Sequence, residues 1–194
     1  MRIVVMNHVS LDGVMQSPGR GDEDTRDGFD RGGWASSRSD ELVGQAMSER
    51  MAAGGGLAGW LFGRRTYEDV LSHWNSVPDS PFAEALNNTP KYVASTTLRE
   101  PLAWPNSTLL GADAVTAVAR LREEPGGVVG VMGSGALIQA LRREHLIDEY
   151  LLMIHPIVLG SGRRLFPDGA PAELRLVDTK TSPTGVILVT YDAG

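Results

Sequence analysis

The segment most able to do chemistry is Gly-Ser-Gly at residues 133–135. It directly follows the apolar run 128–132, and the residues after it recur at helical spacing. Glycine lets a ligand approach the backbone closely, and the first amides of a helix are unpaired donors at the positive end of the helix dipole. The segment therefore predicts an anion site, with phosphate as its natural guest. The alternative is an ordinary tight turn with Ser134 as a helix cap.

A second junction of the same kind lies at residues 63–66, Gly-Arg-Arg-Thr, between the apolar run 60–62 and an apolar helical face. The guanidinium forks of Arg64 and Arg65 match phosphate oxygens, and Thr66 adds a hydroxyl. Arginines at a helix start also form surface salt bridges, which is the alternative.

A third candidate segment, Ser-Thr-Thr at residues 95–97, ends the apolar run that begins at Lys91. Its hydroxyls would lie at the carboxyl end of a strand, where α/β sheets bind ligands. If the three strands that precede these junctions are neighbours, one extended phosphate-rich cofactor can touch all three. That neighbourhood is an expectation here.

Other catalytic patterns are weaker. No Gly-x-Ser-x-Gly elbow occurs, and the four histidines lack metal-ligand spacing, so we expect no metal site. The acidic run in residues 22–30 falls short of a calcium loop, so a solvated loop is favoured. Asp12 follows the first strand and either orients a substrate or closes an Asx turn with Gly13.

Composition narrows the function further. The formal net charge is −6, which disfavours nucleic acid and anionic membranes as partners. The chain has no cysteine, which excludes disulfides and thiolate chemistry. The N-terminal apolar run is too short for a signal peptide, and no window approaches a membrane span, so we expect a cytoplasmic protein.

The elements that must position these residues read as α/β. The 194 residues fit one domain, 1–194, in which strand-like and helical segments alternate. The pattern predicts a mixed sheet, parallel where helices cross over and antiparallel at the C-terminal end. Expected strands are 3–8, 60–62, 91–95, 107–110, 128–132, 149–159, 174–179 and 185–191. Expected helices are 39–51, capped by Ser39 and ended by Gly54 to Gly56, then 67–74, 114–122 and 136–141, with 78–90 irregular or briefly helical and 17–37 a long loop.

Taken together, these motifs resemble the dihydrofolate-reductase-like family that includes the C-terminal reductase domain of the bifunctional riboflavin-biosynthesis deaminase/reductase. The resemblance rests on VSLDGVMQ, LFGRRTYE, KYVASTTL, VMGSGALIQAL and LMIHPIVLGSGRRLF, in that order over nearly the whole chain. It implies a three-layer fold with a central, mostly parallel sheet, an antiparallel C-terminal hairpin and helices on both faces. It also implies NADPH as the hydride donor.

The resemblance further implies roles for particular residues. Arg64, Arg65 and Thr66, after Gly63, would hold cofactor phosphates, and Ser95 with Thr96 would lie near the adenosine 2′-phosphate. The pyrophosphate would be wrapped by Gly133, Ser134, Gly135 and Ala136, with the Gly133–Ser134 peptide as a candidate cis bond. Val14 and Met15 would border the nicotinamide.

The expected reaction is hydride transfer to a small C=N or C=O substrate, similar to 5-amino-6-(5-phosphoribosylamino)uracil reductase or dihydrofolate reductase. Met47 stands about where dihydrofolate reductases carry their pterin-binding acid, with Asp40, Glu41 and Glu49 as substitutes, which speaks against folate. No cysteine-bearing deaminase domain is present, so a stand-alone reductase is expected. The proton donor is open between Asp12 and a water admitted by the 17–37 loop, on which Trp34 is either a lid or an anchor.

Two other functions stay open. The protein could be an NADPH-responsive binding or regulatory protein without turnover, or a binding protein for a phosphorylated metabolite. The strand-rich C-terminal part, around residues 150–159, favours a homodimer.

Overall fold

The chain divides into two compact units. The computed structural model describes residues 1–38, 40–53, 55–167 and 171–194. Unit 1 consists of Met1–Ile3 and Met51–Leu146, and unit 2 consists of Val4–Arg50 and Ile147–Gly194. The single-domain organisation expected from the length stays a prediction.

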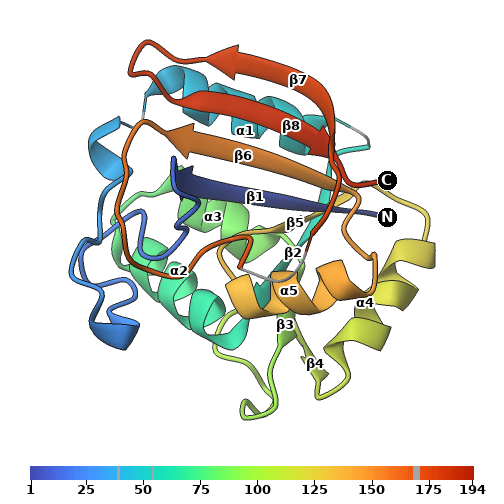
Figure 1. The fold of residues 1–194 in the computed structure, drawn as a ribbon. Helices are drawn as coiled ribbons and strands as arrows, with labels where there is room; N and C mark the ends of the chain where they lie inside the picture. The colour runs from blue at the N-terminus through green and yellow to red at the C-terminus, as the bar shows by residue number, and fades with distance from the viewer. Residues whose placement is uncertain (39, 54, 168–170) are drawn as a thin grey trace. The chain divides into compact units, whose positions relative to one another are not determined.

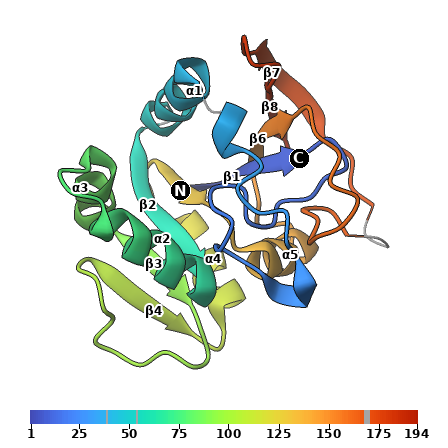
Figure 2. The ribbon, with the colours of Figure 1, turned by 90° about the vertical axis from the view of Figure 1, so that its left-hand side faces the viewer.

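Unit 1 contains four parallel strands in the order β4-β3-β2-β5. Their bounds are β2 (Leu57–Gly63), β3 (Lys91–Ala94), β4 (Ser107–Gly111) and β5 (Val128–Val131). Every residue of β5 is buried, as expected for a parallel strand covered on both faces. The covering helices are α2 (Arg64–Ser76), α3 (Pro81–Asn88), α4 (Ala114–Glu123) and α5 (Gly135–Arg143). Figure 2 shows α2 and α3 on one side of these strands and α4 and α5 on the other.

Local sequence explains where two of these helices form. The apolar stripe of α2 buries Tyr67, Val70 and Leu71, as the helical spacing predicted. The segment that was expected to be irregular or briefly helical forms α3. Its start is fixed by Pro81 in the first turn and by the Ser80 side chain, which accepts a hydrogen bond from the Ala83 amide at 3.2 Å.

Unit 2 contains four strands in the order β1-β6-β8-β7, with bounds β1 (Arg2–Ser10), β6 (Glu149–His155), β7 (Arg175–Thr181) and β8 (Ile187–Asp192). β1 and β6 run parallel, whereas β8 is antiparallel to both β6 and β7. The predicted antiparallel C-terminal hairpin is therefore confirmed (Figure 1). The expected strand 149–159 is too long. Pro156 has no N–H to donate to a ladder, and β6 ends at the residue before it.

One face of the unit 2 strands is covered by α1 (Glu41–Ala52). Arg50 of this helix forms a two-pronged ion pair with Glu149, which is buried on β6. Lys180 on β7 donates to Glu49 Oε2 at 3.0 Å. These contacts fix the helix across three strands of the sheet.

The start of α1 is stabilised by Asp40, whose Oδ1 accepts a hydrogen bond from the Val43 amide at 3.1 Å. The predicted cap Ser39 and the predicted terminator Gly54 lie outside the described residues. No helix in the described ranges is long and apolar enough to cross a membrane.

The long segment after β1 is irregular, as predicted, and contains two short 3-10 turns, η1 (Arg26–Gly28) and η2 (Ser36–Arg38). It is nevertheless well packed. Phe29 and Trp34 are buried against Val14 and Leu159 in a small apolar cluster of unit 2.

Candidate functional site

The three polar junctions of unit 1 lie side by side at one edge of the sheet. β2 pairs in parallel with β3 on one side and with β5 on the other. Gly63 is in register with Ala94, and Leu61 with Val131, so the carboxyl ends of the three strands line up. The neighbourhood on which the sequence argument depended is therefore confirmed.

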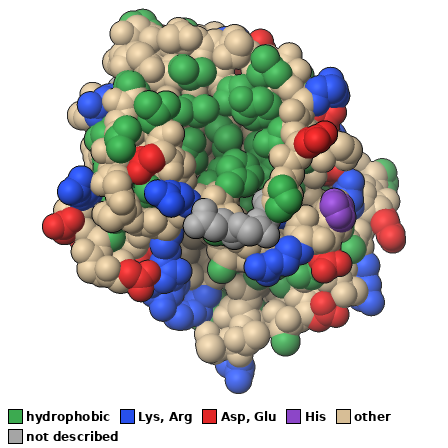
Figure 3. Space-filling view, viewed as in Figure 1, with side chains coloured by type: hydrophobic (Ala, Val, Ile, Leu, Met, Phe, Trp, Pro, Cys, Tyr) green, Lys and Arg blue, Asp and Glu red, His purple; other side chains and the backbone are tan. Residues whose placement is uncertain are grey.

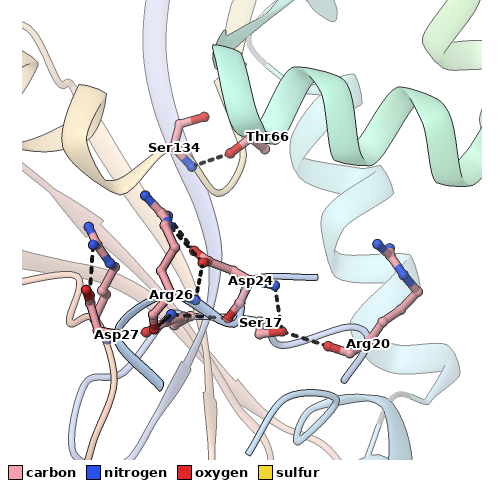
Figure 4. Close-up of polar contacts among 9 residues, drawn as sticks. Ser17, Arg20, Asp24, Arg26, Asp27, Thr66 and Ser134 are labelled. Atoms are coloured by element: carbon pink, nitrogen blue, oxygen red, sulfur yellow. Dashed lines mark hydrogen bonds and ion pairs between the residues drawn. The ribbon is translucent and has the colours of Figure 1, made fainter. Parts of the chain in front are cut away.

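The β2–α2 and β5–α5 junctions are joined by hydrogen bonds that use the predicted residues (Figure 4). The Ser134 amide donates to Thr66 Oγ1 at 2.9 Å, and the Gly63 amide donates to Ser134 Oγ at 3.0 Å. The Ser134 hydroxyl in turn donates to the Met132 carbonyl at 2.9 Å. These bonds hold the two junctions together and occupy the Ser134 side chain.

The turn before α5 is made by two successive residues in the left-handed region, Gly133 at φ +57° and Ser134 at φ +55°. A Cβ atom at Gly133 would lie 2.8 Å from Thr66 Cγ2, so only glycine fits without displacement. The expectation of a cis Gly133–Ser134 peptide is wrong, because this bond is trans. The sharp change of direction comes from the two positive φ angles instead.

Both helices that start at these junctions are open to an anion. Gly63 precedes α2 and has no side chain to cap it, and the Ser134 side chain does not cap α5. The first amides of a helix have no partner within the helix, so those of Gly135 and Ala136 are suited to bind phosphate oxygens.

The flanking polar residues differ in how free they are. Arg64 is half-buried and its Nη1 lies 3.2 Å from Glu68 Oε2, so it makes the surface ion pair that was the alternative. Arg65 is exposed. Ser95 is buried and its Oγ accepts the amides of residues 97 and 98 at 3.1 and 3.0 Å, which closes the turn after β3. Thr96 is exposed.

Asp12 in unit 2 is fully engaged as an acceptor. Its carboxylate accepts the amides of Leu159 and Gly160 at 3.0 and 2.8 Å and the Ser10 hydroxyl at 2.7 Å. These hydrogen bonds, that of Leu159 foremost, lower the pKa of Asp12 to about 2. The carboxyl group is ionised at neutral pH, so the structure favours a fastening role for Asp12 over proton donation.

Val14 and Met15, which were expected at the nicotinamide, are both buried. The Val14 amide donates to Ser10 Oγ at 2.9 Å, and the Met15 amide donates to the Arg163 carbonyl at 2.9 Å. Trp34 donates its indole N–H to the Gln16 carbonyl at 2.8 Å. The buried indole acts as an anchor for the loop, and the cofactor contact of Val14 and Met15 stays a prediction.

The loop that carries Trp34 is held by its own polar network (Figure 4). Arg26 Nε donates to Asp24 Oδ1 at 2.7 Å, and the same hydrogen bond is the first cause of the lowered pKa of Asp24. Ser17 Oγ donates to the Arg20 carbonyl at 2.7 Å and accepts from the Asp24 amide at 3.1 Å. The acidic run is thus ion-paired, and among the described residues no group of three or more His, Asp or Glu is placed to hold a metal.

The carboxylates of α1 are also committed. Asp40 accepts from Thr184 Oγ1 at 2.8 Å in addition to capping the helix, and Glu49 accepts from Lys180. Glu41 is exposed. None of these contacts resembles a free acid held in a pocket.

A pair of histidines was missed by sequence reasoning. His8 Nδ1 and His155 Nε2 lie 2.8 Å apart, and the edge of Trp34 packs on His155. Burial lowers the pKa of each ring to about 4. His155 is 0% exposed, and its Nδ1 has no hydrogen-bond partner among the described residues. The two positions are 147 residues apart, so only the β1–β6 register could have revealed the pair.

With this geometry established, the comparison with known families is decisive for one point. The RibD C-terminal domain family matches residues 2–188, and the chain belongs to this family. Two Bacillus subtilis (strain 168) proteins, both uncharacterized, are similar in sequence. YyaP is 29% identical over 137 residues, 68% of this chain and 71% of YyaP. YwjB is 35% identical over 74 residues, 38% of this chain and 42% of YwjB.

Solved structures support the fold. A Shewanella sp. PV-4 protein named for riboflavin biosynthesis has a TM-score of 0.67 at 24% identity, covering 100% of this chain and 99% of that one. The Thermotoga maritima deaminase/5-amino-6-(5-phosphoribosylamino)uracil reductase scores 0.62 at 15% identity, with 100% and 56% covered. Enterococcus faecalis dihydrofolate reductase, solved with NADP(H), scores 0.60 at 13% identity, with 98% and 94% covered. The predicted dihydrofolate-reductase-like fold is confirmed.

Proposed function

We propose that this protein is a reductase that uses NADPH to transfer a hydride to a small C=N or C=O substrate. The observation that carries the proposal is the convergence of two uncapped helix starts at the carboxyl ends of β2 and β5, joined through Thr66 and Ser134. This is an arrangement that binds phosphate groups through backbone amides. Membership of the RibD C-terminal domain family supports a reductase.

The residues of unit 1 fit the phosphates of a dinucleotide. Gly133 leaves space for the close approach of a pyrophosphate, because its backbone carries no Cβ, and the amides of Gly135 and Ala136 would donate to it. Arg65 and Thr96 are exposed and would serve the phosphate groups at the ends of neighbouring strands. When bound, NADPH supplies the hydride.

The proton for the reduced substrate comes from water in this proposal. Asp12 has a pKa of about 2 and carries no proton at neutral pH, and the His8–His155 pair, with pKa values of about 4, is neutral there. A rate limited by solvent protonation should fall with rising pH without a plateau set by a carboxylic acid.

The test is a calorimetric titration of the purified protein with NADPH, NADH, ADP-ribose 2′-phosphate and inorganic phosphate at fixed salt. We expect micromolar binding of NADPH with preference over NADH, and roughly tenfold weaker binding in Thr66→Val, which removes the Oγ1 acceptor. Binding of phosphate and none of the nucleotides would instead indicate a phosphorylated-metabolite binding protein.

Turnover separates the reductase from a cofactor-responsive regulator. Protein that binds NADPH is mixed with pterins, phosphoribosylaminopyrimidines and small carbonyl compounds, and nicotinamide oxidation is followed by absorbance. Oxidation that requires one substrate class supports the proposal. Tight NADPH binding with no oxidation across all three classes would favour the regulatory function.

A further inference from the structure

One face of the unit 2 sheet has an unusual composition. The register of the strands places Tyr150, Leu152 and Ile154 of β6 opposite Tyr191, Val189 and Ile187 of β8. Residues paired across strands share a face of the sheet. On β7 the same face carries Leu176, Thr179 and Thr181. We call these nine positions the open face; none of them carries a charge.

The opposite face of the same strands is different. It carries Glu149 and Lys180, which bond to α1, together with Arg175, Asp178 and Asp192. The charges of the three strands are therefore segregated onto the face that the helix covers. A sheet face that faces water in an antiparallel arrangement ordinarily carries the polar residues, so the segregation is reversed here.

The open face is not fully covered within the described residues. Phe166 packs on Tyr150 with ring centroids 5.4 Å apart, and Leu152 and Val189 are buried. Toward the edge strand, however, Ile187 is 40% exposed and Leu176 is 55% exposed. Figure 3 shows apolar side chains gathered in a hollow on this side, over the region where Figure 1 labels β6 and β8. Half of the large apolar residues found exposed lie in the β7–β8 hairpin: Leu176, Val177 and Ile187.

We propose that the open face binds the open face of a second copy of this chain, forming a two-fold symmetric dimer. The chain carries a net charge of −6, so copies repel one another through most surfaces. The open face brings no charges together when it meets itself, and an isologous contact requires this self-complementarity. A partner of opposite charge would have no group to pair with here.

Face packing is favoured over pairing of the two β7 edges. β7 has a register shift between Leu176 and Asp178, and it carries Arg175, Asp178 and Lys180. Bulges and charged residues on an edge strand discourage the addition of another strand. The same strand that resists edge pairing therefore presents an apolar face to a partner.

The size of the open face sets the expected strength. Three strands about 4.8 Å apart and about 20 Å long give an interface at the lower end of specific contacts, so we expect a micromolar dissociation constant. Sedimentation velocity of the full chain over about 1 to 100 µM should show a monomer giving way to a dimer. Because the face is neutral, the constant should change little between low and high salt.

Two variants test the location. Ile187→Glu places two like charges near each other in the dimer and should weaken it on the order of 100-fold. Thr179→Lys does the same at a position that is already polar and exposed, so it leaves folding intact. Val77→Glu is the matched control, because Val77 is 37% exposed on unit 1, outside the open face. It should leave the dimer unchanged.

The proposal is overturned by a monomer throughout the concentration range. It is equally overturned by a dimer that survives both Ile187→Glu and Thr179→Lys, or by one that Val77→Glu dissociates. If Ile187→Glu fails to give a cooperative thermal transition, Thr179→Lys alone decides.

Discussion

The carboxyl ends of β2 and β5 in unit 1 and those of β1 and β6 in unit 2 both end in glycine- and serine-containing turns, yet their polar atoms are used differently. In unit 1 the side chains of Thr66 and Ser134 bond to each other's junction, and the helix amides behind them stay open. In unit 2 the side chains of Ser10 and Asp12 bond to the backbone of neighbouring loops.

The difference shows that similar residue types at strand ends produce two outcomes. A helix that starts directly after the strand leaves donors for a ligand, because its first amides lack partners. A strand followed by a long loop consumes its polar groups in holding that loop, because the buried loop backbone needs partners. Mutations in the two regions should therefore separate ligand binding from stability.

The largest effect is expected at Gly133. In Gly133→Ala the added methyl group meets Thr66 at 2.8 Å and the residue must keep φ near +57°. We expect NADPH affinity to fall on the order of 100-fold and stability to fall by about 1–3 kcal/mol. Calorimetry and thermal unfolding measure the two.

Gly111→Ala is the control for backbone strain alone. Gly111 also has a positive φ, +67°, but a Cβ there meets nothing within 4 Å. We expect a stability loss of about 1 kcal/mol and unchanged NADPH binding. Equal loss of binding in both variants would remove the close approach at Gly133 from the site.

The next effect concerns pH and belongs to unit 2. The folded pKa of His8 and His155 is about 4, against 6.5 for an unperturbed histidine, so the unfolded chain binds more protons between these values. Stability is fully present above pH 6.5 and falls as the pH approaches 4, by on the order of 3 kcal/mol for the first proton. Denaturant unfolding across this range measures the slope.

His155→Phe should flatten that slope, because it removes one of the two buried titrating rings. His145→Asn is the control, since His145 is exposed and its left-handed backbone accepts asparagine. A slope that is the same in wild type and His155→Phe would contradict a neutral buried pair.

Asp12→Asn should cost about 1–2 kcal/mol, because the charged acceptor of two backbone amides is replaced by a neutral group. The expected sign with pH is opposite to that of a raised pKa. The contribution of the lowered Asp12 pKa is present above 3.8 and is lost as the pH falls toward 2. Unchanged NADPH binding in this variant would sharpen the contrast between the two regions, and lost binding would break it.

The smallest effect is expected at Arg64. Arg64→Ala should weaken NADPH a few-fold more than NADH if the guanidinium serves the 2′-phosphate, and it removes a surface ion pair worth about 0.3–0.5 kcal/mol. Glu68→Ala removes the same ion pair and leaves the arginine. NADPH binding in Glu68→Ala should hold or improve, and an equal loss for both nucleotides in Arg64→Ala would remove this residue from the 2′-phosphate role.

Much of this organisation follows from the sequence because it is local. The apolar stripe of α2, the fully apolar β5 and the glycine-containing junctions are each read within about ten residues, and all are found where expected. The neighbourhood of β3, β2 and β5 followed from parallel crossovers, which place consecutive strands near one another.

The rest depends on contacts between distant residues. The partners of Asp12 lie 147 and 148 residues away, and the partner of His8 lies 147 residues away. No spacing rule connects such positions. The use of Ser95 and Ser134 inside their own turns was also hidden, because the sequence shows a hydroxyl and not the acceptor or donor that occupies it.

The division of the chain has a consequence for the order of synthesis. Most of unit 1 is one continuous stretch, Met51–Leu146, whereas unit 2 is formed by a stretch before it and a stretch after it. On the ribosome, the parallel strands with the phosphate-type junctions are complete before β6 emerges. β1 and the loop behind it must wait for the last quarter of the chain, so the protein can acquire a nucleotide-binding surface earlier than it acquires a stable N-terminal strand.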